Sequence, residues 1–214
     1  MERPKRKQID PGKGARDDLS ATTSIKTVGR IMPLETPDDL PTRWRGTPLE
    51  EFVAAHNFQG DIESCTNPRM LLVSCIEFRF RPIIPSGFSY VMRTAGGRLS
   101  NLNGAEFALS YVLSKGVRHI ALVGHNDCGM TKIAGMKPQL IQALVEQGWE
   151  RSKASDFIEK NMEQFSITDE IDSLKKEFMM LKEEFKNVVI APLFASLSSE
   201  RLHLPSWYRH YDPD

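Results

Sequence analysis

The chain has 214 residues, of which 40% are hydrophobic and 26% are charged, and its 28 basic side chains balance 28 acidic ones. A net charge of zero gives no overall field that would favour nucleic acid or anionic lipid. No apolar stretch approaches the roughly 18 residues that a membrane-spanning helix needs, and the N-terminus lacks the apolar core of a signal peptide. We therefore expect a cytoplasmic globular protein that binds neither nucleic acid nor a membrane.

The first part of the chain differs in composition from the rest. Residues 1–45 are rich in proline, glycine and charge, and they include the basic cluster RPKRK. Few apolar positions recur there at a helix or strand period, which is typical of a flexible tail or of an extended arm lying on a partner subunit. Nucleic-acid binding by the basic cluster is the less favoured interpretation. Because Thr47 can cap a helix and Pro48 suits its first position, a folded domain is expected over 46–214.

Short apolar runs alternate with helical patterns along this domain. The runs predict buried strands at 71–75, 89–93, 119–124 and 188–192. A helix is predicted over 103–116, with Phe107, Ala108, Tyr111 and Val112 as its apolar face. A second, highly charged helix carries the apolar stripe Ile171, Leu174, Phe178, Leu181 and Phe185. Alternating strands and helices predict an α/β fold with a mostly parallel β-sheet flanked by helices.

Two of the predicted strands end in metal-binding residue types. Cys75 closes the run LLVSC, and His125 and Cys128 follow the run HIALVG at once. Carboxyl ends of parallel strands meet at one edge of a sheet, so these three side chains can converge. Two thiolates and an imidazole form a recognised zinc set, and three protein ligands leave a fourth position for water. Buried cysteines that only fill the core are the alternative.

Other readings of the cysteines are less favoured. With Cys65, the chain has an odd set of three thiols, which suits a disulfide framework poorly. Cys75 and Cys128 also lack the Cys-x-x-Cys spacing of thiol redox proteins. We interpret Cys65 as structural, and Asp127 as a group that serves the hydrogen bonding of its loop.

Polar residues continue beyond Cys75. Glu77 and Arg79 follow it at two-residue steps, so in extended backbone all three side chains point the same way. Arg79 can hold Glu77 through a forked pair, and the two are our candidate catalytic residues beside the metal. A surface ion pair of little consequence is the alternative.

The segments SCIEFR, VMRTAGG and VGHNDCGM together resemble the beta-class carbonic anhydrases, whose pattern is Cys-x-Asp-x-Arg, then Arg-Asn-Ala-Gly, then His-x-x-Cys-Gly. The similarity spans about residues 48–135. The resemblance implies Zn²⁺ held by Cys75, His125 and Cys128, and reversible hydration of carbon dioxide to bicarbonate. It also implies dimers or higher assemblies whose N-terminal arms embrace their neighbours.

The chain departs from that pattern at two positions, where Glu77 replaces the aspartate and Thr94 replaces the asparagine. The Thr94 change is expected to alter a hydrogen bond in a turn. The longer Glu77 raises two possibilities: Arg79 holds it aside and hydration proceeds, or it binds zinc and closes the site. Alternative functions are therefore a related zinc hydrolase of carbonyl sulfide or carbon disulfide, and a non-catalytic zinc-binding protein.

Overall fold

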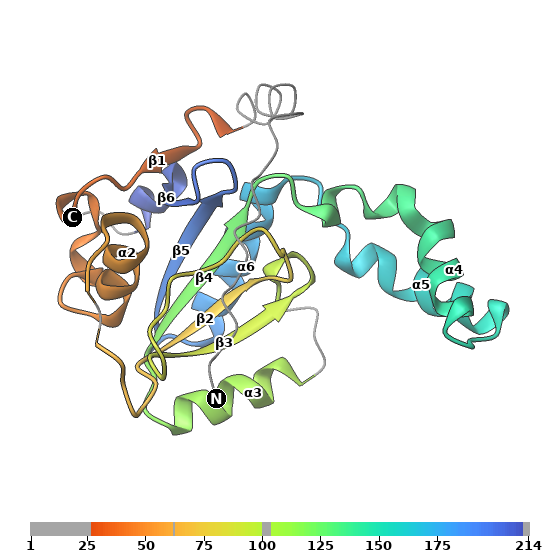
Figure 1. Cartoon of the computed structure of the whole chain (residues 1–214), viewed down its shortest axis with the longest axis horizontal. Helices are drawn as coiled ribbons and strands as arrows, with labels where there is room; N and C mark the ends of the chain where they lie inside the picture. The colour runs from red at the N-terminus through yellow and green to blue at the C-terminus, as the bar shows by residue number, and fades with distance from the viewer. Residues whose placement is uncertain (1–26, 62, 100–103, 212–214) are drawn as a thin grey trace, which may run out of the picture.

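A computed structural model describes residues 27–61, 63–99 and 104–211 of the chain. Within these ranges the strands form one six-stranded sheet in the order β1-β6-β5-β4-β2-β3 (Figure 1). The strands are β1 (Ile31–Pro33), β2 (Met70–Cys75), β3 (Ser89–Thr94), β4 (His119–His125), β5 (Val189–Ser196) and β6 (Arg201–Pro205).

The predicted fold class is confirmed. Strands β3, β2, β4 and β5 pair in parallel, while β6 runs antiparallel to both β5 and β1. All four predicted strands are present, and β5 extends four residues beyond its predicted end. Neither β1 nor β6 was predicted, because β1 has only three residues and both contain a proline that reads as a break.

Helices cover the sheet and extend beyond it. They are α2 (Pro48–Phe58), α3 (Ala105–Ser114), α4 (Lys137–Glu146), α5 (Arg151–Phe165) and α6 (Glu170–Glu184). Helix α2 contacts β4 and β6, whereas α6 contacts β4 and β5. Helices α4 and α5 contact each other and project to one side of the sheet (Figure 1). In the described part of the chain, no helix has the length and apolar character needed to cross a bilayer.

The short connecting helices mark the turns around the sheet. They are η1 (Pro37–Asp39), η2 (Thr42–Trp44), η3 (Ala95–Gly97), η4 (Gly129–Thr131), η5 (Ile133–Met136) and η6 (Ser206–His210). Three of them, η3, η4 and η5, follow the carboxyl ends of β3 and β4, so this edge of the sheet is built largely from tight turns.

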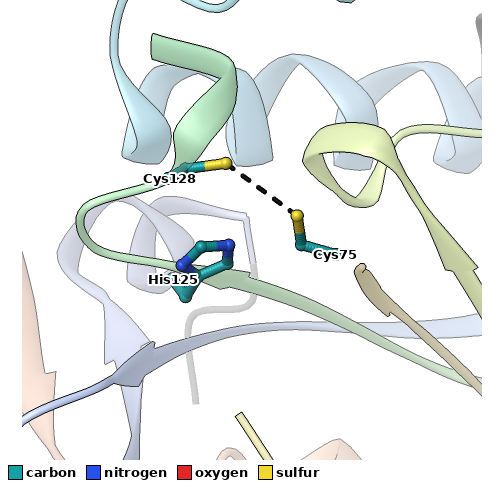
Figure 2. Close-up of side chains that lie close together, drawn as sticks. All are labelled: Cys75, His125 and Cys128. Carbon is teal, nitrogen blue, oxygen red and sulfur yellow. Dashed lines mark hydrogen bonds between the residues drawn. The ribbon is translucent and has the colours of Figure 1, made fainter. Parts of the chain in front are cut away.

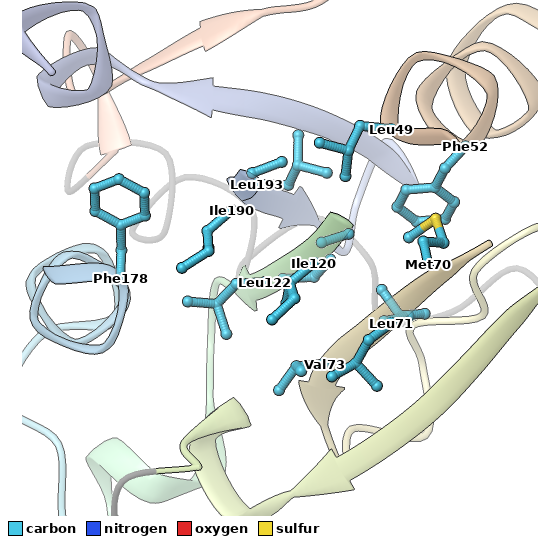
Figure 3. Packing of buried hydrophobic residues seen from close by; sticks show 14 of the residues in the cluster. Leu49, Phe52, Met70, Leu71, Val73, Ile120, Leu122, Phe178, Ile190 and Leu193 are labelled. Atoms are coloured by element: carbon cyan, nitrogen blue, oxygen red, sulfur yellow. The ribbon is translucent and has the colours of Figure 1, made fainter. Parts of the chain in front are cut away.

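The central strands form the core. Every residue of β2 is buried, which requires cover on both faces of the sheet. Figure 3 shows Leu71 and Val73 of β2 beside Ile120 and Leu122 of β4, with side chains of α2 and α6 around them. A strand buried on both faces reads as a continuous apolar run, and this is why these strands were predictable from the sequence.

The second half of the expected arm packs on the domain. Leu34, Leu40 and Trp44 are all 2% exposed or less, and Trp44 Nε1 donates a hydrogen bond to the Tyr208 hydroxyl at 3.2 Å. Strand β1 pairs with β6 on the edge of the sheet. Residues 1–26 of the expected arm lie outside the described residues.

Helix α3 is present, and Val112 of its predicted apolar face is buried, but the prediction is wrong for the two aromatic residues of that face. Phe107 is 78% exposed and Tyr111 is 52% exposed. The buried side chains of α3 are Ala105, Leu109 and Val112. The helix is therefore turned so that its small and aliphatic residues meet the core, and its aromatic residues face outward. Residue 103, where the helix was predicted to begin, lies outside the described ranges.

Candidate metal centre

The predicted ligands lie at the carboxyl edge of two adjacent strands. Cys75 is the last residue of β2, and His125 is the last residue of β4. The two strands are parallel neighbours in which Ser74 pairs with Val123, so the ends of both strands reach the same level. Cys128 follows after a short loop and precedes η4.

The structure brings the three side chains together. One donor atom each from Cys75, His125 and Cys128 lies within 4.8 Å of the others. Figure 2 shows the two thiols and the imidazole around one point. All three residues are at most 5% exposed, and the cysteines form no disulfide. The group is therefore a closely spaced, buried set of soft donors.

The orientation of His125 fits a metal ligand. Its Nδ1 lies 2.9 Å from the backbone oxygen of Asn126, a contact in which Nδ1–H donates. In that tautomer Nε2 carries the free lone pair. Nε2 is buried, and no group among the described residues forms a hydrogen bond with it. A buried polar atom without a partner costs free energy unless a ligand satisfies it, so the site fits a cation such as Zn²⁺.

The two thiols perturb one another. A hydrogen bond from Cys128 lowers the pKa of Cys75, and His125 lowers it further. The same contact raises the pKa of Cys128, and burial adds to that effect. For His125, burial opposes the charged form, but the Cys75 sulfur, the Asn126 backbone oxygen and the Glu77 carboxylate together outweigh burial and raise the pKa. The contact between the two sulfurs therefore favours the thiolate form of Cys75 over that of Cys128.

Glu77 and Arg79 form a pair beside this group. Arg79 donates from Nε to Oε1 of Glu77 at 2.7 Å and from NH2 to Oε2 at 2.8 Å. The backbone N–H of Arg79 also donates to Oε1 at 2.9 Å. These bonds lower the pKa of Glu77 to about 2, so the carboxylate is ionised at neutral pH. The donor group within 4.8 Å does not include Glu77.

The backbone after β2 departs from the extended form assumed for Glu77 and Arg79. The strand ends at Cys75, and residues 76–79 form a turn. Ile76 and Phe78 are 58% and 78% exposed, whereas Glu77 is only 9% exposed. Burial therefore alternates as predicted from Cys75 to Phe78, but not at Arg79, whose side chain is 40% exposed.

Two further residues hold this turn in place. Arg93, near the end of β3, donates to the backbone oxygens of Glu77 and Phe80, each at 3.0 Å. Asp127 accepts a hydrogen bond from Arg79 NH1 at 2.9 Å. The motifs contain both residues, but neither partner could be read from them, because each contact joins segments that only the folded sheet brings together.

The turn after β3 packs against the site. Thr94 Oγ1 donates to the backbone oxygen of Arg98 at 2.9 Å, which is the kind of turn hydrogen bond expected to change at this position. Gly97 has a φ of +68°, and a Cβ at this residue would lie 3.3 Å from the Cys75 nitrogen. A residue without a side chain therefore permits the turn to approach the backbone of Cys75, the first predicted ligand.

An apolar pocket opens beside the centre. Cys75 and Cys128 pack with Ile167, and Met130 packs against this cluster. Met130 also lines a cavity of about 230 Å³ beneath α4 and α5. Its other lining residues are Ala95, Ile133, Leu140, Phe157, Ile158, Asn161, Met162 and Phe165. Met130 thus lies between the two thiols and a mostly apolar cavity.

Comparisons with known proteins bear on the fold. No protein-family model matches the chain, and no curated protein matches its sequence. Among solved structures, beta-carbonic anhydrase isoform I from Trichomonas vaginalis is 18% identical with a TM-score of 0.55, and the match covers 71% of this chain and 91% of that one. The carbonic anhydrase from Streptococcus mutans is 19% identical with a TM-score of 0.51 and the same coverages.

A third solved structure has a similar fold. The carbonic anhydrase from Glaciozyma antarctica is 22% identical with a TM-score of 0.51, and the match covers 76% of this chain and 98% of that one. The resemblance suggested by the three motifs thus extends to the fold. The chain has the fold of the beta-carbonic anhydrases.

Proposed function

We propose that the protein catalyses the zinc-dependent, reversible hydration of carbon dioxide to bicarbonate. The observation that carries this proposal is the buried group of Cys75, His125 and Cys128, in which Nε2 of His125 has no hydrogen-bond partner among the described residues. The adjacent Glu77–Arg79 pair supports a catalytic rather than a purely structural centre. The fold shared with beta-carbonic anhydrases adds further support.

Three atoms would hold the metal: the sulfurs of Cys75 and Cys128, and Nε2 of His125. Zinc bound by three protein ligands keeps one position for water and lowers the pKa of that water, which supplies a nucleophile near neutral pH. The hydrogen bond from His125 Nδ1 to the Asn126 backbone fixes the tautomer that such binding needs.

The neighbouring side chains have separate roles in this proposal. The ionised Glu77 carboxylate accepts a hydrogen bond from the reacting water and so orients its lone pair. Arg79 holds that carboxylate at two oxygens and prevents it from rotating. The apolar pocket lined by Met130 is the candidate binding site for a small neutral substrate, because its mostly apolar walls bind water weakly.

The test combines metal analysis with stopped-flow kinetics. We expect about one zinc per chain and measurable carbon dioxide hydration by the native protein and by Glu77→Asp, since both carry a carboxylate that Arg79 can hold. Glu77→Ala should keep zinc and lose about 10- to 100-fold in kcat/KM, as is typical when a group that orients a metal site is removed. Absence of metal from the native protein would refute the proposal.

The same proteins should be assayed with carbonyl sulfide and carbon disulfide. Hydrolysis of either compound without hydration of carbon dioxide would assign the site to a related zinc hydrolase. Zinc binding with no turnover of any of the three substrates, together with hydration by Glu77→Asp, would mean that Glu77 closes the native site.

We also propose that the chain self-associates as a dimer or a higher assembly. An apolar surface on edge strand β3, helix α3 and the turn after β2 supports this. The exposed side chains are Ile76, Phe78, Ile83, Val91, Phe107 and Tyr111. Tyr90 of β3 contacts Tyr111 of α3 with ring centroids 6.3 Å apart, so the surfaces of β3 and α3 are joined.

Light scattering tests this proposal. The native protein should have at least twice the monomer mass, and Phe107→Glu should have a lower mass. A monomeric native protein would refute self-association.

A cytoplasmic location fits the chemistry of the cysteines. All three are free thiols in the structure, and two of them belong to the candidate metal site. Reducing compartments keep such thiols available for a metal. Imaging of the tagged full chain would test this proposal, and an extracellular or membrane signal would contradict it.

A further inference from the structure

Asp127 lies at the centre of a network that connects the two halves of the candidate site. It stands between His125 and Cys128 in the loop after β4. Its Oδ2 accepts from Arg79 NH1 at 2.9 Å, and its backbone oxygen accepts from Arg79 NH2 at 3.2 Å. Its Oδ1 accepts from Lys132 Nζ at 2.6 Å. One residue of the loop thus binds Arg79 through both its side chain and its backbone.

The guanidinium of Arg79 is therefore held between two carboxylates. Its Nε and NH2 atoms donate to Glu77, while NH1 and NH2 donate to Asp127. A planar guanidinium has its donors in a fixed arrangement, so it cannot turn without breaking bonds to one of the two acids. Contact with Asp127 consequently fixes the orientation in which Arg79 presents its fork to Glu77.

The backbone of Asp127 is shaped for this contact. Its φ is +53°, in the left-handed region that aspartate and asparagine tolerate better than most residues. Both its backbone oxygen and its side chain reach Arg79 in this conformation. The carboxylate is 29% exposed, compared with 66% for the side chain of Lys132. The contact with Arg79 is thus the inner bond of the network, and the contact with Lys132 is the outer one.

If Arg79 did not hold it, the Glu77 carboxylate could bind the metal instead. Carboxylates are themselves zinc ligands, and His125 is close enough to contribute to the lowered pKa of Glu77, although Arg79 contributes more. Glutamate also has one more methylene than aspartate, so its carboxylate has a longer reach. Arg79 holds this carboxylate away from the metal position, and the orientation of Arg79 depends in turn on Asp127.

We propose that Asp127 is a positioning residue that anchors Arg79 from the His-x-x-Cys loop and so keeps the Glu77 carboxylate from becoming a fourth ligand of the metal. This proposal rests on the proposed function, since it requires a metal held by Cys75, His125 and Cys128. It gives the loop residue a role in maintaining the vacant position of the site.

The test measures whether that position is open. Zinc is replaced by Co²⁺, whose visible absorption reports its ligands, and azide is titrated into the full-length protein. Asp127→Gly removes the carboxylate while tolerating the positive φ, and Asp127→Asn keeps an oxygen that can accept from Arg79. Lys132→Met is the matched control, because it removes the outer bond of Asp127 and leaves the inner one.

We expect Asp127→Gly to weaken azide binding by about 10- to 100-fold, the usual effect of losing a group that supports metal ligands. Loss of a negative charge near the metal would by itself strengthen anion binding, so weaker binding cannot come from charge alone. Asp127→Asn and Lys132→Met should stay close to the native protein. In a Glu77→Ala background, Asp127→Gly should have no further effect, because the competing carboxylate is gone.

Three results would overturn the proposal. One is an unchanged azide affinity in Asp127→Gly; another is an equal loss in the Glu77→Ala background, which would indicate general distortion of the loop. The third is a native protein that binds cobalt but responds to azide only after Glu77→Ala, since Glu77 would then already be a ligand. Azide binding needs no turnover, so it can succeed where carbon dioxide hydration fails, and the two proposals fail separately.

Discussion

The sulfur of Cys75 lies 3.9 Å from the sulfur of Cys128, although the two residues are 53 positions apart in the sequence. The contact arises because β2 and β4 are parallel neighbours that end at one edge of the sheet. The sulfurs are too far apart to be bonded, and the imidazole of His125 completes the group. Two thiols and an imidazole buried at such spacing are arranged to share a cation.

Removing any one of these donors should release the metal. We expect Cys75→Ser, Cys128→Ser and His125→Ala each to lower the zinc content measured by mass spectrometry to well below one per chain. Chelation of the native protein should lower its melting temperature, because a ligand that binds only the folded state stabilises it.

Cys65 provides the matched control for the thiols. It is half-buried, and its Sγ donates to the backbone oxygen of Glu63 at 3.5 Å, away from the other two cysteines. Cys65→Ser should keep the full zinc content. If Cys65→Ser lost as much zinc as Cys75→Ser, the assignment of the ligands would be wrong.

The sequence indicated the metal group because each candidate ligand follows a strand that is easy to recognise. Cys75 and His125 stand at the ends of strands buried on both faces, and the apolar runs predict where those strands stop. The contacts of Arg79 were only half predictable. Its pairing with Glu77 is local, two residues apart, whereas its bonds to Asp127 depend on how the loops after β2 and β4 meet.

The edge of the sheet was harder to predict than its centre. Strand β1 and the turn at Trp44 lie in a segment rich in proline and charge, where few apolar residues recur at a fixed period. The segment gains its order from tertiary contacts with β6 and Tyr208 rather than from a local pattern. The prediction that Phe107 and Tyr111 lie on the buried face of α3 was wrong for a related reason: hydrophobic spacing cannot distinguish core packing from an exposed apolar surface.

Trp44 should therefore contribute strongly to stability, although it lies in the expected arm. It is fully buried, and its ring centroid lies 5.4 Å from that of Tyr208. Trp44→Ala should lower the free energy of unfolding by about 3 to 5 kcal/mol, as measured by urea denaturation. Trp149, a half-buried residue between α4 and α5, is the control, and Trp149→Ala should cost clearly less. Equal losses would contradict the packing of this segment.

Asp169 should make the start of α6 sensitive to acid. Its carboxylate accepts from the backbone N–H groups of Ile171 and Asp172, at 3.0 and 2.9 Å, and from Arg30 at 2.7 Å. Burial alone would raise the pKa of Asp169, but the bond from Arg30 and the capping bonds outweigh it and lower the pKa. The native state thus binds this proton less readily than the unfolded chain does.

The lowered pKa of Asp169 determines how its contribution to stability changes with pH. The stabilisation by Asp169 is fully present above its unfolded pKa of about 3.9, and it is lost as the pH falls through the lower folded value. Asp169→Ala should cost about 1 kcal/mol at neutral pH through loss of the cap, and Asp169→Asn should cost less. The difference between the native protein and either variant should shrink in urea titrations toward pH 3; a difference that stays constant would contradict this account.

Gly97 should couple the turn after β3 to the metal site. Its φ of +68° makes any side chain unfavourable, by about 1 to 2 kcal/mol. An added Cβ would also lie 3.3 Å from the Cys75 nitrogen and 3.4 Å from the Val123 oxygen, so it would press on the backbone of the first ligand. We expect Gly97→Ala to lower both the free energy of unfolding and the affinity for zinc in a chelator competition.

Gly116 separates these two effects. It has a φ of +88° after the end of α3, and a Cβ there would meet nothing within 4 Å in the part of the chain that the structure describes. Gly116→Ala carries the same kind of backbone strain, but it does not touch the site. It should lower stability while leaving the zinc affinity unchanged. If both variants weakened zinc binding equally, the loss would follow from reduced stability alone, and the contact between Gly97 and Cys75 would have no specific role in shaping the centre.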